Sequence, residues 1–198
     1  EFWNYNSSLH NYITMASTTR SSTGFNCGTD AAGMALWYTT GTGRLLESPA
    51  GTYTANTWHH TAYVKSNGTI KVYVDGVERD SATDSINYDK TDLSIGALDN
   101  AGEYMSGYMD EIRISNIARY TSSFTPSTSA FIKDSNTKLL IHSNNANGYT
   151  TFTDSSGVVG GLGNDQSGIE NHWTTHNLIS TDQMLDSPTN NFAVMNPL

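Results

Sequence analysis

Two adjacent histidines beside a tryptophan are the first residues of the 198-residue sequence that could do chemistry. His59 and His60 lie in the segment NTWHHTAYVKSNGTIKVYVDGVERDS, residues 56–81. Paired histidines can bind a metal or transfer protons only if their side chains meet. Side chains alternate between the two faces of a β-strand, so His60 points the same way as Trp58 and His59 points the opposite way. We therefore expect scaffold roles, with His60 buried and satisfied and His59 exposed.

Oxygen-bearing side chains gather in the loop ALDNAGEYMSG, residues 97–107, and in the strand that follows it. The loop brings Asp99, Asn100 and Glu103 close together shortly before Asp110. Calcium takes about six to eight oxygen ligands from carboxylates, amides and carbonyls, and such a loop can supply several of them. The spacing is not that of an EF-hand, so a solvated acidic turn is the alternative. Asp99, Asn100 and Asp110 are thus candidate ligands for Ca²⁺.

Asp110 is the carboxylate whose surroundings the sequence constrains most. In GYMDEIRIS, residues 107–115, it shares one strand face with Tyr108, Ile112 and Ile114. An unpaired charge buried among isoleucines would be costly or would be forced to take a proton. Backbone amides, an arginine or a calcium ion would each satisfy this carboxylate, so a structural and a metal-binding role both stay open.

Composition restricts the classes of partner. The chain has 10 basic and 19 acidic residues and a net charge of −9. This balance disfavours nucleic acids and anionic membranes, because binding to phosphate requires clustered Lys and Arg. Cys27 is the single cysteine, so the chain forms no internal disulfide and no cysteine-based zinc site.

The elements that position these groups are short strands. Runs with a two-residue apolar period alternate with turn residues, and no long run has a helical period. The runs are 11–18, 33–40, 58–65, 69–74, 93–98 and 107–115. This pattern predicts an all-β fold, a sandwich or jelly roll of two antiparallel sheets. From residue 127 onward the sequence is rich in glycine and loop residues around one predicted strand, KLLIHS (138–143). A domain boundary is therefore expected near residue 127.

Several quoted segments together resemble one family. They are EFW (1–3), NTWHHTAYV (56–64), VYVDG (72–76), LSIGA (93–97) and GYMDEIRISNIARYTSSFTP (107–126). In this order they are similar to the laminin-G-like or pentraxin-like branch of the concanavalin A-like lectin/glucanase superfamily. The resemblance implies a two-sheet jelly-roll domain over residues 1–126, often with calcium, often binding glycans and often repeated in surface or phage tail proteins.

The C-terminal region, residues 127–198, carries two further resemblances. Residues 134–157 look like the opening strands of another repeat, and residues 182–198 look like a linker of phage tail proteins. Family members begin with a strand like KLLIHS ahead of EFW, so the N-terminal strands are expected to be missing from this chain. We hypothesise that residues 138–143 occupy the vacated sheet position, because an open sheet edge recruits strands.

The family resemblance also implies where ligands bind. Exposed aromatic rings stack on sugars in this fold, which makes Tyr53, Tyr88 and Tyr104 candidate ligand contacts, whereas Trp3 and Trp58 are expected inside the sandwich. Glucanases of the superfamily carry an E-x-D-x-x-E strand, and no segment here has that pattern. We expect a noncatalytic module, not an enzyme, that recognises glycans or a host surface receptor on a virion or an extracellular surface. The alternatives are a virion decoration or assembly module that contacts other subunits or its own copies, and, less favoured, a glycoside hydrolase.

Overall fold

The computed structural model describes residues 1–10, 12–17, 23–39, 43–90, 92–98, 103–144 and 151–156. Within these ranges the chain forms strands and no helix. The strands are β1 (Phe2–Asn6), β2 (Tyr12–Ala16), β3 (Phe25–Thr29), β4 (Ala35–Thr39), β5 (Gly43–Glu47), β6 (Trp58–Ser66), β7 (Thr69–Val74), β8 (Val77–Thr83), β9 (Ser94–Ile95), β10 (Gly107–Asp110), β11 (Ile112–Ser115) and β12 (Thr137–Ile141). None of the described residues forms a helix that is long and apolar enough to span a membrane.

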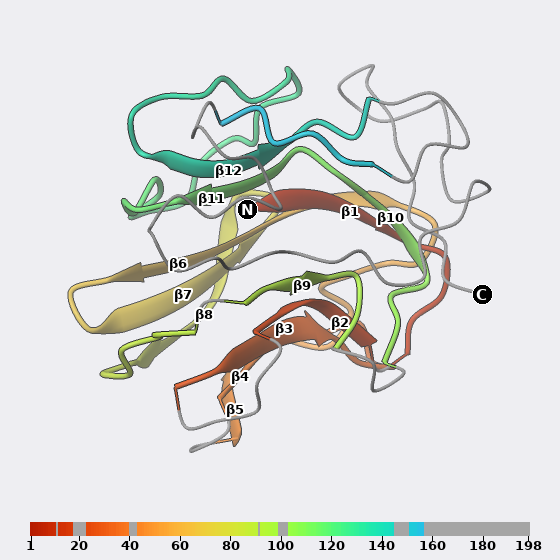
Figure 1. Ribbon diagram of the computed structural model, residues 1–198. Helices are drawn as coiled ribbons and strands as arrows, with labels where there is room; N and C mark the ends of the chain where they lie inside the picture. Colours follow the sequence, from red (N-terminus) through yellow and green to blue (C-terminus); the bar gives the residue numbers. More distant parts are fainter. Residues whose placement is uncertain are drawn as a thin grey trace.

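Two five-stranded antiparallel sheets form a sandwich, and a two-stranded sheet lies beside it (Figure 1). The first sheet has the order β10-β1-β6-β7-β8 and the second has the order β5-β4-β3-β2-β9. Strands β11 and β12 form the additional pair. The predicted all-β sandwich of the concanavalin A-like type is therefore confirmed.

The meander predicted from the WHH segment is present as β6, β7 and β8. Asn67-Gly68 and Asp75-Gly76 make its two tight turns, and all four residues have positive φ. Such turns match the right-handed twist of the strands that they join, which is why Asn-Gly and Asp-Gly specify hairpins. The ladder runs from Thr61–Val74 to Ser66–Thr69.

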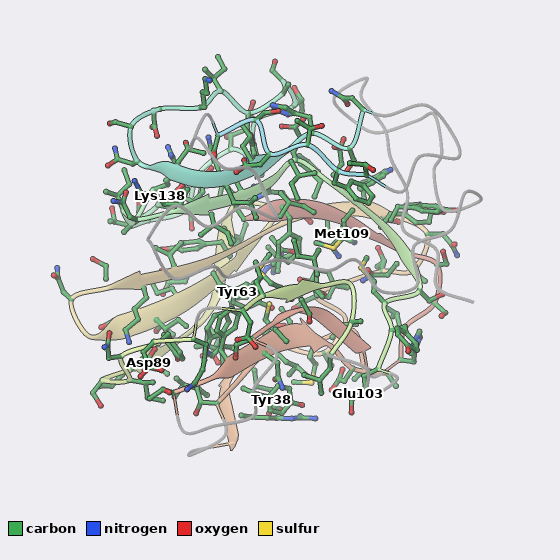
Figure 2. All side chains as sticks on the ribbon, viewed as in Figure 1. Tyr38, Tyr63, Asp89, Glu103, Met109 and Lys138 are labelled. Carbon is green, nitrogen blue, oxygen red and sulfur yellow. The ribbon has the colours of Figure 1, made fainter. Side chains whose placement is uncertain are left out.

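The hydrophobic core lies between the two large sheets. Tyr63 of β6 and Met109 of β10 point into this interior, whereas Tyr38 lies on the outer side of the second sheet (Figure 2). Opposite the first sheet, Trp37 and Leu46 are buried on the second. One face of each large sheet packs toward this core, and residues from 118–131 cover part of the other face of the first sheet.

The strand GYMDEIRIS changes its partner at Glu111. Glu111 has a φ of 50°, and this kink separates β10, which pairs with β1, from β11, which pairs with β12. Strand β12 contains most of KLLIHS and pairs with β11, with Ile141 opposite Ile112, in a two-stranded sheet separate from the two large ones. That this segment takes the position of a missing N-terminal strand stays a hypothesis. Whether residues 127–198 represent the start of a further repeat stays a prediction.

Candidate functional site

Both histidines of the WHH segment are buried and bound to carboxylates. His59 Nδ1 lies 2.7 Å from Asp75 Oδ2, and its Nε2 lies 3.1 Å from Thr54 Oγ1. His60 Nε2 lies 3.1 Å from Glu1 Oε2 on the opposite face of β6. The expectation that His59 is exposed is wrong: it is 7% exposed, because the turn at Asp75 folds back over it. The two rings point apart, as predicted, and serve the scaffold.

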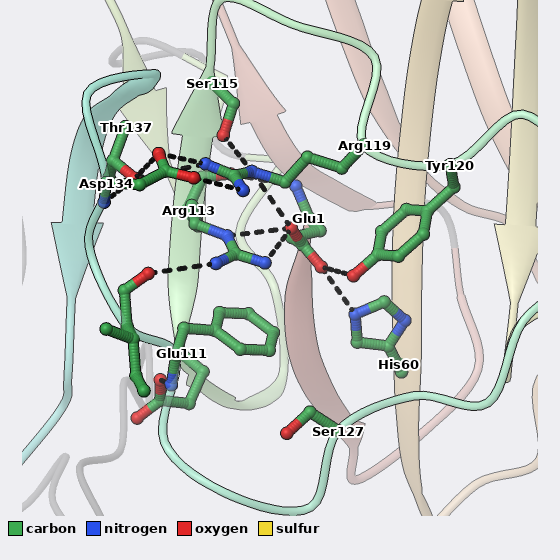
Figure 3. Close-up of polar contacts among 12 residues, drawn as sticks. Glu1, His60, Glu111, Arg113, Ser115, Arg119, Tyr120, Ser127, Asp134 and Thr137 are labelled. Atoms are coloured by element: carbon green, nitrogen blue, oxygen red, sulfur yellow. Dashed lines mark hydrogen bonds and ion pairs between the residues drawn. The ribbon is translucent and has the colours of Figure 1, made fainter.

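Glu1 is the centre of a buried polar network that the sequence did not reveal (Figure 3). Arg113 donates Nε and Nη2 to Glu1 Oε1 at 2.8 and 2.6 Å. Tyr120 donates its hydroxyl to Oε2 at 2.6 Å, on the side where His60 also approaches. Burial alone would raise the pKa of the Glu1 carboxyl, but the hydrogen bonds of His60 and Tyr120 and the charge of Arg113 lower it below its usual range.

A second ion pair ties the network to the segment that follows residue 127. Arg119 donates both terminal nitrogens to Asp134, at 3.0 and 2.8 Å, and its Nε to Ser115 at 2.6 Å (Figure 3). The Arg119 hydrogen bonds lower the pKa of the Asp134 carboxyl. Bidentate geometry of this kind fixes orientation, so the loop before β12 is held on the sandwich.

His60 makes stability depend on pH. Burial lowers the pKa of His60 from its usual 6.5, and its Nδ1 has no hydrogen-bond partner among the described residues. The unfolded chain therefore binds a proton before the folded chain does, and stability falls as the pH drops below about 6.5. We expect the Tm to fall by up to about 4 °C per pH unit between pH 6.5 and 5.

Thermal melts of the His60→Gln variant check this expectation. The variant should melt lower at pH 7.5 but show a flatter pH dependence than the parent chain. His10→Gln is the matched control, because His10 lies at the surface beside Ser8 and should leave the slope unchanged. An unaltered slope in His60→Gln would assign the pH dependence to other groups.

Asp110 and Glu111 are fully buried and satisfied by protein donors. Asp110 Oδ1 accepts the backbone N–H groups of Glu111 and Ser143 at 2.7 and 3.2 Å. Glu111 Oε2 accepts the backbone N–H of Phe131 at 2.6 Å, and Oε1 lies 2.8 Å from His142 Nδ1. Of the two roles left open for Asp110, the structure therefore displays the structural one, in which the kinked strand is anchored to the residues around β12.

Two of the three predicted calcium ligands, Asp99 and Asn100, lie outside the described residues. In the part of the chain that the structure describes, no group of three or more His, Cys, Asp or Glu side chains could hold a metal ion. Asp110 Oδ1 is engaged by two amides, and the assignment of Asp99, Asn100 and Asp110 to a calcium site stays a prediction.

The three predicted ligand-contacting tyrosines have different environments. Tyr53 is 3% exposed, and its hydroxyl lies 2.8 Å from Thr61 Oγ1, so its ring offers no exposed platform. Tyr88 is half-buried and donates its hydroxyl to Asp84 at 2.8 Å. Tyr104 is half-buried before β10. The prediction for Tyr53 relied on its turn-rich neighbourhood, which in the folded chain packs against β6.

An aromatic row crosses three strands of the first sheet on its outer face. Tyr5 of β1 pairs with Trp58 of β6 on one side and with Tyr108 of β10 on the other. The ring centroid of Tyr5 lies 5.8 Å from that of Trp58 and 5.2 Å from that of Tyr108. All three rings are half-buried, so each keeps part of its surface open. The expectation that Trp3 and Trp58 lie inside the sandwich is wrong, because both alternate with the inward-facing residues of their strands. Trp3 is buried in a separate cluster with Phe131 and Leu140, and Trp58 packs against that cluster.

Hydrogen-bonding groups border the aromatic row. The Tyr5 hydroxyl donates to Asn56 Oδ1 at 3.3 Å, and Asn56 itself is exposed at the start of β6. Its positive φ of 58° and its N–H bond to the Asn6 carbonyl at 2.7 Å fix this turn against β1. Aromatic faces flanked by amide and hydroxyl groups are suited to sugar rings, which present apolar faces and a polar rim.

A family model and a solved structure are similar to this chain. Residues 1–123 match the family model described as the concanavalin A-like lectin/glucanases superfamily. The fold is similar to a crystal structure from Bacteroides ovatus ATCC 8483 described as a "putative carbohydrate binding protein", with a TM-score of 0.51 and 13% identity. The match covers 79% of this chain and 48% of that one, so the chain spans about half the length of that protein. No curated protein matches the sequence.

Proposed function

Because the chain belongs to the concanavalin A-like lectin/glucanases superfamily, whose family model matches residues 1–123, we propose that it is a noncatalytic module that binds carbohydrates. The aromatic row Trp58–Tyr5–Tyr108 is the observation that carries the proposal. Strand pairing holds the three rings rigidly, so the surface needs little reorganisation to receive a ligand. Asn56 supplies an amide at its border for reading hydroxyl groups.

The proposal that the module is noncatalytic rests on the environments of its acidic side chains. Glycoside hydrolysis needs two carboxyl groups on opposite sides of the scissile bond, one of them ready to donate a proton. Asp110 and Glu111 are buried and engaged by backbone amides, and Glu1 is held by Arg113 and Tyr120. No E-x-D-x-x-E segment is present in the sequence.

Replacing Trp58 with alanine is expected to weaken glycan binding at least about tenfold, because the central ring of Tyr5 then loses its neighbour and the ligand loses a stacking face. A glycan array identifies a ligand for the parent chain, and isothermal titration calorimetry with that ligand measures the loss. Tyr108→Ala should behave in the same way.

Tyr38→Ala is the matched control for these variants. Tyr38 is also half-buried, but it lies on the outer side of the second sheet, where Arg44 sits 5.6 Å from its ring centroid. Its loss should leave affinity unchanged. If Tyr38→Ala and Trp58→Ala weaken binding equally, or if the array shows no ligand, the aromatic row is not a carbohydrate site.

To test the calcium prediction, the same glycan array is run once with calcium and once with EDTA. Loss of binding in EDTA would support the predicted ligands Asp99, Asn100 and Asp110. Retained binding would leave recognition to aromatic and amide groups, with Tyr88 and Tyr104 as additional candidate contacts.

The finer hypothesis is that the module belongs to a larger viral tail or other surface protein and sits on a virion or an extracellular surface. Its support is the resemblance of residues 182–198 to phage tail linkers. A host surface receptor, further virion subunits and copies of the same chain are the partners that this hypothesis names.

A further inference from the structure

The aromatic row lies among uncharged side chains. Strand β1 and residues 53–57, which lead into β6, contain no Asp, Glu, Lys, Arg or His. The ionisable residues next in line on the same face of β6 and β10 are His60 and Asp110, and both are 0% exposed. A ligand that lies on the three rings therefore meets aromatic, amide and hydroxyl groups of these segments and no charged side chain from them.

Asn56 presents a rigidly held amide at the border of the row. Its backbone N–H donates to the Asn6 carbonyl at 2.7 Å, and its φ is 58°. The Tyr5 hydroxyl donates to Asn56 Oδ1 at 3.3 Å, so the oxygen end of the amide is already engaged. No described residue accepts a hydrogen bond from Asn56 Nδ2, and the side chain is exposed. The free end of this amide is thus a pair of N–H donors.

We infer that the aromatic row selects neutral glycans over acidic ones, and that Asn56 Nδ2 donates to a hydroxyl oxygen of the bound sugar. This inference rests on the proposed function and adds the chemical class of the ligand. A sugar hydroxyl accepts from a neutral amide without any change of charge, and an amide that is held in place needs little reorganisation to donate.

An acidic sugar would lack a counter-charge on this surface. A carboxylate or sulfate group that loses water against the rings must be compensated by a cation, and the strands of the row supply none. The net charge of −9 adds a general repulsion toward anionic ligands. Uncharged pyranose rings with free hydroxyl groups avoid both costs.

Matched pairs of glycans test the selectivity. The array carries each neutral glycan beside its sulfated and sialylated forms, and isothermal titration calorimetry compares the members of the pair with the strongest signal. We expect the neutral member to bind at least about tenfold more tightly. High salt should narrow this difference by screening the repulsion of the acidic member, while the affinity of the neutral member stays the same.

Asn56→Asp tests the donor at the border of the row. Aspartate keeps the shape of the side chain, tolerates a positive φ and still accepts from Tyr5, but it replaces the two N–H donors with a carboxylate oxygen. The variant should bind the neutral glycan at least about tenfold more weakly. Asn67→Asp is the matched control: Asn67 is also exposed and has a φ of 50°, but it lies in the turn between β6 and β7, so its affinity should equal that of the parent chain.

The outcomes separate this inference from the proposed function. If the acidic member of a pair binds as tightly as the neutral one while Trp58→Ala still weakens binding, the row binds carbohydrates but does not select neutral ones. If Asn56→Asp and Asn67→Asp both bind like the parent chain, Asn56 is not the donor. A chain that binds no glycan, or whose binding ignores Trp58→Ala, overturns the proposed site and this inference together. Circular dichroism checks that each variant keeps the fold.

Discussion

Arg113→Met is expected to lower the free energy of unfolding by about 3–5 kcal/mol, because it removes the cation that donates two hydrogen bonds to the buried carboxylate of Glu1. The Glu1 side chain is 4% exposed and receives two hydrogen bonds from Arg113. Methionine also removes the guanidinium that lies 4.2 Å from the ring centroid of Phe131. Urea unfolding followed by tryptophan fluorescence measures the change.

Arg44→Met is the control for Arg113→Met. Arg44 forms an ion pair with Glu47 at 3.2 Å, but its side chain is 40% exposed. Exposed pairs contribute no more than about 1 kcal/mol, so this variant should unfold close to the parent chain. Equal losses in the two variants would mean that the Glu1 network contributes no more than a surface pair.

Gly107→Ala is the second change with a large expected effect, a loss of about 3 kcal/mol or more. A Cβ at this position would lie 1.8 Å from the carbonyl oxygen of Tyr5, and φ is 148°. The β1 and β10 backbones must therefore separate at the point where the aromatic row crosses them, so glycan affinity should fall together with stability. Thermal melts and calorimetry with the same ligand test both effects.

Gly51→Ala separates backbone strain from close approach. Gly51 also has a positive φ, 74°, but a Cβ there meets no atom within 4 Å. Its replacement should cost about 1 kcal/mol, the ordinary price of a left-handed alanine. A loss at Gly107 no larger than at Gly51 would show that β10 can move away from Tyr5 freely.

Local patterns were enough to predict the sheets. The two-residue period and the Asn-Gly and Asp-Gly turns determine β6, β7 and β8, because adjacent strands pair through short connections. Asp110 is buried as expected, but the predicted face shared by Tyr108, Ile112 and Ile114 is wrong: the kink at Glu111 breaks the alternation, so Tyr108 lies beside Tyr5 on the outer face while Ile112 joins the core. The donor of Asp110, Ser143, was not predictable, because its N–H lies just after β12, 33 positions further along the chain.

The candidate site depends on contacts that local patterns do not encode. Tyr5, Trp58 and Tyr108 form one row only through the registers of β1 with β6 and β10, and a shift by one residue would send a ring to the other face. No sequence pattern predicted the role of Glu1, because its partners lie far along the chain. The alternation of side chains along a strand could have predicted that Trp58 and Tyr5 are exposed only if the core-facing side of each strand had been known.

The partners of Glu1 also determine when the protein can fold during synthesis. Glu1 and Arg113 are separated by 112 positions, so Glu1 stays without this partner until Arg113 has been made, shortly after β10, the last strand of the first sheet. At about 5–20 residues per second the ribosome takes about 6–22 s to cover that distance, longer than the milliseconds to seconds in which such sheets fold. Translation, rather than folding, therefore sets the moment at which the first sheet closes, and until then chaperones have access to its apolar strands.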